Sequence, residues 1–367
     1  MTVMKTTHHT SLSSGIHRAF TLVELLVSLA VLSILLLINA QVIGQVQATW
    51  SASNARVSQF REARTAFDII TRNLSQATLN TYLDYETNYL ATAAATSGTA
   101  AATGPGSYVR RSDLQFICGN STTLLPDAGG ADSLPGHSIF FQAPLGVTQN
   151  PNYVGLDRLL CSRGYFVQFS SDEFFTPAFL PEGNNRYRYR LMEYSPPAEK
   201  NVIYTLPTGT AGTVTGKFYA DAGAPLEADE TAVNISTTRP VADNILTLII
   251  SPRREPKAGE AEGANGPTEI ASDYQYNSSA TGPTQNLLPP LIRVVLVAID
   301  EKSAERLAET SGSPNTPPFG TSLSTPFTQA YQLDDEIKAL VATLQAQRVN
   351  YRVFSATVQL RGAKWGI

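Results

Sequence analysis

Hydrophobic side chains follow one another almost without interruption from Phe20 to Ala40. A helix of this stretch would be about 30 Å long at 1.5 Å per residue, which is enough to cross the hydrocarbon core of a bilayer. Glu24 is the only charged side chain between Arg18 and Arg56. A carboxylate at the centre of a membrane costs about 2.5–3.5 kcal/mol, so such a residue usually has a partner and a function. The pattern predicts a membrane-spanning helix with one functional acid.

After about residue 50 the apolar residues take up a helical period. They recur every three or four positions and charged residues lie between them, which indicates an amphipathic helix with one buried side. No proline occurs before Pro105. We therefore expect one helix over residues 20–82, membrane-spanning over residues 20–40 and packed on a globular domain in its second half. The recurring apolar positions are Val57, Phe60, Ala63, Phe67, Ile70, Leu74 and Ala77.

Apolar runs in the rest of the chain predict strands. Residues 245–250 and 294–299 are apolar on both faces, which is typical of central strands. Residues 91–106 and 252–290 are rich in turn-forming residues, so we expect long exposed loops there. Strands are predicted at residues 114–118, 138–142, 164–169, 186–194, 244–251, 291–299 and 349–360, and a helix at residues 333–348.

These elements predict an α+β protein in which a long N-terminal helix packs on an antiparallel β-sheet domain. Its parts would be a leader at residues 1–19, the helix at residues 20–82 and an ectodomain at residues 83–367. The 367 residues, of which 43% are hydrophobic, are enough to build a sizeable core. The formal net charge of −4 gives no electrostatic reason to expect nucleic acid as the main partner.

The N-terminal residues resemble those of a known family. A short basic leader ends at Ala19, and the sequence Phe-Thr-Leu-Val-Glu-Leu-Leu then opens the apolar helix. This arrangement resembles the N-terminus of type IV prepilins and type II secretion pseudopilins. The resemblance implies that a prepilin peptidase cuts between Ala19 and Phe20 and methylates the new amine. Two features depart from the family pattern: Ala19 replaces the commoner glycine, and Gln41 stands where many major pilins have a kinking proline.

The resemblance also implies a pilin-like fold and a single-pass protein of the inner membrane with its C-terminal domain in the periplasm. The expected partners are prepilin peptidase, other pilin or pseudopilin subunits of a fibre, and an inner-membrane assembly platform. The length of the chain favours a minor subunit similar to the J-type pseudopilins. Residues 350–365 look like those of the Verru_Chthon cassette group of pilin-like proteins.

Glu24 is expected to set the axial register between subunits. Cleavage would give Phe20 a free ammonium, and in a fibre the Glu24 carboxylate of one subunit could pair with that ammonium of a neighbour. In a low dielectric this attraction is strong, and a missing partner leaves a buried charge unpaired. The alternative is that Glu24 reaches the lipid headgroups. For the whole protein, the alternative is a membrane-anchored binding or adhesion domain that never polymerises.

Cys118 and Cys161 are the only cysteines. The predicted location outside the cytoplasm permits a disulfide, which would stabilise the fold by about 3–4 kcal/mol in the chain-entropy model. Two buried free thiols are the alternative, because the sequence does not show whether the sulfurs meet.

The sequence gives little support for catalysis. His137 would be the only histidine after cleavage, whereas zinc sites need more ligands and a serine triad needs a nucleophile motif. We therefore expect no enzyme, no metal site and no cofactor, and we interpret His137 as a turn or edge residue. Two acidic groups that calcium could use are interpreted as a solvated loop and a helix start. They are Glu227, Asp229 and Glu230, and Asp334, Asp335 and Glu336.

Arg186, Arg188 and Arg190 alternate with apolar and aromatic residues. A period of two places the three guanidinium groups on one face of a strand. Such a face could bind an anionic ligand, such as DNA or a polysaccharide, with modest and salt-sensitive affinity. The simpler interpretation is a solvated outer face over a core lined by tyrosines.

Overall fold

The structure is a computed structural model, and it describes the chain in several segments. Residues 1–20 and the predicted loop at residues 91–106 lie outside the described residues. The chain divides into two compact units, residues 1–55 and residues 56–367. The described segments are residues 21–85, 108–171, 186–201, 218–223, 237–256, 259, 268–310, 316–323 and 327–363.

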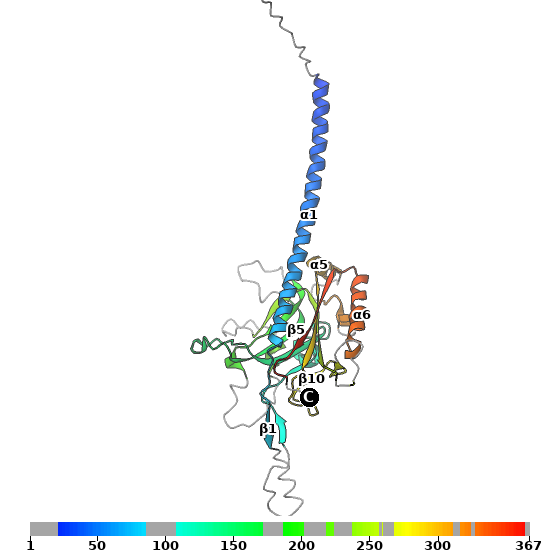
Figure 1. Cartoon of the computed structure of the whole chain (residues 1–367). Helices are drawn as coiled ribbons and strands as arrows, with labels where there is room; N and C mark the ends of the chain where they lie inside the picture. Colours follow the sequence, from blue (N-terminus) through cyan, green and yellow to red (C-terminus); the bar gives the residue numbers. More distant parts are fainter. Residues whose placement is uncertain are drawn as a thin grey trace, which may run out of the picture. The chain divides into compact units, whose positions relative to one another are not determined.

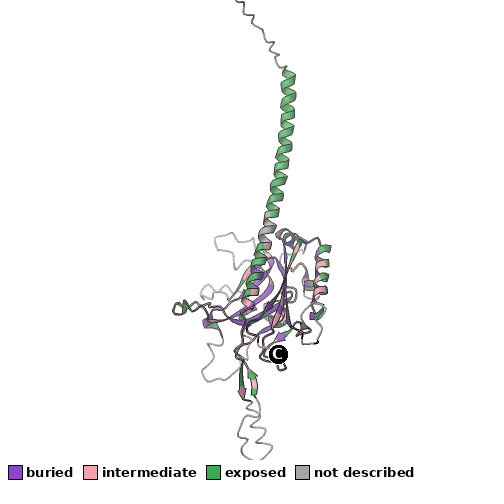
Figure 2. Cartoon of the chain, viewed as in Figure 1, coloured by how far each residue is buried: buried purple, intermediate pink, exposed green. Residues whose placement is uncertain are grey.

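After Thr21, the described part of the first unit is helical and belongs to helix α1 (Leu22–Leu74). Within α1, the segment Leu22–Ser51 is long and apolar enough to cross a membrane. Its 30 residues would extend about 45 Å, compared with about 30 Å for the hydrocarbon core. All residues of this segment are exposed, as the green ribbon of Figure 2 shows. The predicted apolar helix is therefore present.

The second unit contains two antiparallel sheets and a separate two-stranded ribbon, β1-β2 (Figure 1). The larger sheet has the strand order β10-β3-β4-β5-β6-β7, and the smaller has the order β12-β11-β8-β9. The strands are β1 (Tyr82–Tyr85), β2 (Tyr108–Arg111), β3 (Ile117–Asn120), β4 (His137–Pro144), β5 (Leu160–Ser171), β6 (Tyr187–Tyr194), β7 (Thr238–Asp243), β8 (Ile245–Arg254), β9 (Thr268–Glu269), β10 (Tyr276–Asn277), β11 (Leu291–Ile299) and β12 (Tyr351–Gln359).

Helices connect and cover the sheets. Among them, α6 lies against the smaller sheet, where Asp334 of α6 pairs with Arg293 of β11. Besides α1, the described helices are α3 (Ser121–Leu124), α5 (Glu301–Thr310) and α6 (Leu333–Ala346), with the 3-10 turns η1 (Pro126–Ala128), η2 (Pro151–Tyr153), η4 (Ala198–Lys200), η5 (Ala220–Gly223), η6 (Gly320–Leu323) and η7 (Ala330–Gln332).

The amphipathic part of α1 packs on the core that both sheets share. Its predicted apolar positions Phe67, Ile70 and Leu74 are buried there. The rings of Phe67 and Phe354 of β12 have centroids 5.9 Å apart. A long helix packed on antiparallel sheets confirms the predicted α+β fold.

The two sheets meet at Gly136, which forms a parallel bridge with Leu248 of β8. Gly136 has a φ of +75°, and a Cβ at this position would lie 2.5 Å from the Leu248 carbonyl oxygen. Glycine fits because it has no Cβ and tolerates a positive φ. The next residue, His137, is only 2% exposed, and the amide of Ile250 donates to its Nδ1 at 3.1 Å. The interpretation of His137 as a turn or edge residue is therefore wrong.

Two further predictions from the hydrophobic pattern are wrong. Helix α1 ends at Leu74 rather than at residue 82, because the amide of Thr78 already donates to a carbonyl of β4, that of Gln142, at 3.0 Å. The described part of the predicted excursion at residues 252–290 is not exposed throughout. Its residues Tyr274, Tyr276 and Leu288 are buried, since β10 extends the larger sheet at β3.

Candidate functional site

The one acid of the apolar helix lies in its first turn. The amide of Glu24 donates to the Thr21 carbonyl at 3.0 Å and to the Thr21 hydroxyl at 3.3 Å. Thr-x-x-Glu is the pattern of a capping box, so Thr21 caps the helix that Glu24 helps to start. The helix dipole also favours a carboxylate at this position. The sequence contains this signal, but the interpretation of Glu24 from the sequence used only its charge.

Polar side chains further along the apolar segment bond to their own helix. Ser28, Ser33 and Asn39 each donate to a carbonyl oxygen three or four residues earlier. Such bonds allow a polar side chain to lie in an apolar medium, where no water satisfies it. The Glu24 carboxylate, in contrast, has no hydrogen-bond or ion-pair partner among the described residues.

Residues 16–38 match the family model described as the prokaryotic N-terminal methylation motif. The chain carries the type IV prepilin signature. This signature includes Glu24 together with Ala19 and Phe20, the predicted cleavage residues, which lie outside the described residues. No curated protein and no solved structure gives a significant match to the chain.

The prepilin signature implies processing by prepilin peptidase and assembly with other pilins. Together with the apolar segment Leu22–Ser51, it fits a pilin-like protein anchored in a membrane. A signature of this kind is typical of structural rather than catalytic proteins. The remaining residues that the sequence singled out all belong to the second unit.

Arg186, Arg188 and Arg190 lie together, as their spacing predicts, but they do not form a solvated face. Arg188 and Arg190 are only 9% and 2% exposed. A guanidinium nitrogen of Arg188 lies 3.1 Å from a Glu301 carboxylate oxygen, and one of Arg190 lies 3.0 Å from an Asp243 carboxylate oxygen. Arg186 also reaches Glu301, at 3.8 Å. Two carboxylates therefore occupy the groups that an anionic ligand would need, and the interpretation as a solvated outer face is wrong.

The two cysteines do not form the expected disulfide. Both are free and buried, Cys118 in β3 and Cys161 in β5. Strand β4 separates them, and on it they lie opposite Ile139 and Ala143. With about 4.8 Å between strands and 3.4 Å per residue, their Cα atoms are on the order of 17 Å apart, whereas a disulfide needs less than about 7 Å. The alternative of two buried thiols describes this structure.

Three carboxylates at the start of α6 have protein partners. Asp334 pairs with Arg293, with a nitrogen–oxygen distance of 3.2 Å, and Asp335 pairs with Lys338 at 2.8 Å. Glu336 is buried, a feature that the sequence did not indicate, and it accepts hydrogen bonds from two backbone amides at 2.9 Å and from a tyrosine hydroxyl. Within the described segments, no group of three His, Cys, Asp or Glu side chains is placed to hold a metal ion.

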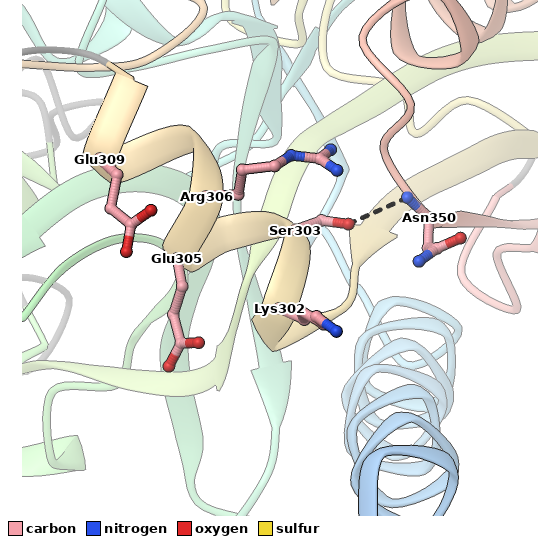
Figure 3. Close-up of a pocket in the computed structure, with 6 residues that line it drawn as sticks. All are labelled: Lys302, Ser303, Glu305, Arg306, Glu309 and Asn350. Atoms are coloured by element: carbon pink, nitrogen blue, oxygen red, sulfur yellow. Dashed lines mark hydrogen bonds between the residues drawn. The ribbon is translucent and has the colours of Figure 1, made fainter. Parts of the chain in front are cut away.

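The other acidic group, at residues 227–230, lies outside the described residues. A hollow of about 490 Å³ lies beside α5 (Figure 3). There the Ser303 hydroxyl accepts from the Asn350 amide at 3.1 Å, and Arg306 donates to two backbone carbonyls after α6. These polar atoms hold α5 against the chain between α6 and β12. We therefore assign no catalytic role to the hollow, which is lined by Lys302, Ser303, Glu305, Arg306, Glu309 and Asn350.

Proposed function

We propose that this protein is a minor pilin or pseudopilin subunit that enters a fibre through its N-terminal helix. It waits in the inner membrane with its C-terminal domain in the periplasm, and prepilin peptidase removes residues 1–19. The observation that carries this proposal is the Glu24 carboxylate, which stands within an apolar segment and has no partner among the described residues.

Cleavage before Phe20 supplies the missing partner. The new terminal ammonium of one subunit lies near the start of its helix, as Glu24 does in the neighbour, so the two charges meet when helices pack side by side. At 4 Å and an effective dielectric constant of 20, their attraction is about 4 kcal/mol. A shift of one subunit along the fibre axis separates the charges, so the pair fixes the register.

The minor-subunit role is supported by size. The chain has 367 residues and its second unit holds two sheets, which is larger than the family resemblance implies for a major pilin. A J-like position and an inner-membrane assembly platform as partner remain part of the proposal. The likeness of residues 350–365 to the Verru_Chthon cassette group stays a prediction.

Processing is tested by mass spectrometry of the mature protein from its own host. We expect an N-terminus at Phe20 with a methylated amine. A membrane protein that retains Met1 would instead support the non-polymerising anchored domain.

Assembly is tested with a Glu24→Ala variant and a matched Ser28→Ala variant. Both remove a polar group from the same segment, but the Ser28 hydroxyl bonds to its own helix backbone at 2.9 Å. We expect Glu24→Ala to insert and be processed normally while its amount in sheared fibres falls at least tenfold. Ser28→Ala should change that amount by less than twofold. Equal incorporation of the two variants would refute the pairing argument.

A further inference from the structure

Within the described residues the two sheets have four edges, and three of these carry features that prevent pairing with another strand. Strand β7 contains Pro240 and a register shift against β6. Strands β9 and β10 have two residues each. Proline, irregular register and short length are the means by which proteins protect exposed edges.

Strand β12, the fourth edge, has none of these features (Figure 1, red). It pairs with β11 over nine residues without a register shift. It contains no proline, and Arg352 is its only charged residue. A long regular edge of this kind is a template for another strand.

The register shows which backbone groups of β12 face outward. The Leu360 amide donates to the Pro290 carbonyl at 3.0 Å, and the Asp300 amide donates to the Asn350 carbonyl at 3.2 Å. Both bonds continue the pairing of β11 with β12, in which bonded positions alternate. The even-numbered residues of β12 therefore bond to β11, and the odd-numbered ones point their N–H and C=O groups away. These are Tyr351, Val353, Ser355, Thr357 and Gln359.

The outward backbone groups have no partner among the described residues. The side chains of Ser355, Thr357 and Gln359 are exposed, so solvent reaches this edge. The free stretch ends at Arg361, whose amide donates to the Ser75 carbonyl after α1 at 3.3 Å. Five residues therefore offer unpaired donors and acceptors at the spacing of one strand.

A second copy of β12 does not suit this edge if the proposed function holds. Two identical edges pair about a two-fold axis and so run antiparallel. The end of α1 follows β12 in the same direction, since Phe67 lies on Phe354 and Ser75 lies beside Arg361. Pairing two copies would turn these helix segments in opposite directions, whereas subunits inserted in one membrane share a direction.

The side chains beside the edge define the chemistry of its occupant. On the face toward α1, Phe354 and Ala356 are partly buried and apolar, and on the other face Ser355 and Thr357 are exposed and polar. Arg352 is exposed and has no carboxylate partner among the described residues. We propose that β12 binds an extended segment of a different protein chain as an added strand, with alternating apolar and polar residues and an acidic residue beside Arg352.

Hydrogen exchange of the purified full chain in detergent gives the first test. Amides of the even-numbered residues 352–358 should exchange at least a hundredfold more slowly than those of the odd-numbered residues 351–359, read by fragmentation mass spectrometry. Equal protection of both sets would show that the edge is already covered and would overturn the proposal. Protection of the odd set that grows with protein concentration would identify a second copy as occupant and would also overturn it.

The second test adds a synthetic nine-residue peptide that alternates valine and threonine and carries one glutamate near the end that meets Arg352. We expect it to slow exchange of the odd-numbered amides at least tenfold. The control is the same peptide with N-methylated backbone amides on its edge-facing side, which should leave the exchange rates unchanged. This control uses the unmodified protein. If both peptides give the same exchange rates, strand addition is refuted.

A matched pair of variants then places the peptide on the outward groups. Thr357→Pro removes one outward N–H, whereas Thr357→Val keeps it. We expect peptide affinity to fall at least tenfold in the first and less than twofold in the second; equal affinity would refute the site. These measurements need no fibre, so a negative result for peptide binding at β12 does not contradict the proposed function. Absence of cleavage before Phe20 would likewise not contradict peptide binding at β12.

Discussion

His137 makes the stability of the second unit, residues 56–367, depend on pH in a way that can be calculated. Burial lowers the pKa of His137 from its ordinary value of 6.5 to about 4, although a backbone hydrogen bond with Ile250 and, less strongly, the charge of Asp273 act in the opposite direction. Its ring lies 4.8 Å from that of Tyr274, and the Ile250 amide donates to its Nδ1. Protonation would place a charge in this apolar junction between the sheets, so the folded state keeps the imidazole neutral.

The direction in which the free energy of unfolding changes with pH follows from proton binding. Between pH 6.5 and pH 4 the unfolded chain binds a proton at His137 that the folded chain does not bind, so stability is complete above pH 6.5 and is lost as pH falls toward 4. At 1.36 kcal/mol per pH unit, the loss between pH 7.5 and pH 4.5 is about 2.5 kcal/mol.

A His137→Asn variant isolates this contribution, because asparagine keeps an acceptor near the Ile250 amide but does not titrate. Carboxylates that titrate below pH 5 change the free energy of unfolding equally in both proteins, so they cancel in the difference between wild type and variant. Urea unfolding of the full chain in detergent, followed by circular dichroism, gives the free energy of unfolding at each pH. The advantage of the wild type over the variant should shrink by about 2.5 kcal/mol between pH 7.5 and pH 4.5. A constant difference across this range would show that burial of His137 does not lower its pKa.

Other parts of the ectodomain give further predictions. Gly136→Ala should lower the free energy of unfolding by roughly 3 kcal/mol, measured by the same urea unfolding, because its Cβ would meet backbone at a positive φ. Glu336→Ala should cost about 3 kcal/mol and Glu336→Gln about 1 kcal/mol, since an amide oxygen still accepts from the two backbone amides. With no reductant present, Cys118 and Cys161 should not react with a thiol reagent in the folded protein, and both should react once the protein is unfolded. If they formed a disulfide, the unfolded protein would contain no thiol that could react.

The elements that the sequence predicts well are those whose signal is local. The apolar segment after Phe20, strand β11 at residues 291–299 and the start of α6 depend on hydrophobic runs and first-turn acids that the chain shows directly. Strand β7 was missed because Pro240 argues against a strand, yet an edge position tolerates it. Helix α5 was missed because only a few of its residues are apolar.

The wrong predictions at candidate sites have another cause: the group that contacts each residue lies far away in the sequence. Arg188 seemed solvated because its partner, Glu301, lies more than a hundred residues later. His137 seemed to be a turn residue because β8, which buries it, is equally remote. A single sequence shows the polarity of a residue but not the group that neutralises it.

The prepilin signature and the second unit of the chain concern different environments. In the proposed subunit, residues 16–38 serve insertion into a membrane and release from it, where the solvent is lipid and a single charge dominates. Residues 56–367 would then recognise, in water, any partner that distinguishes such a subunit from others. Arg188 and Arg190 of β6 are buried and already paired with carboxylates, whereas a row of unpaired backbone groups fixes both the position and the direction of what binds. Specificity in such a subunit is therefore expected at a sheet edge rather than at the paired arginines of β6.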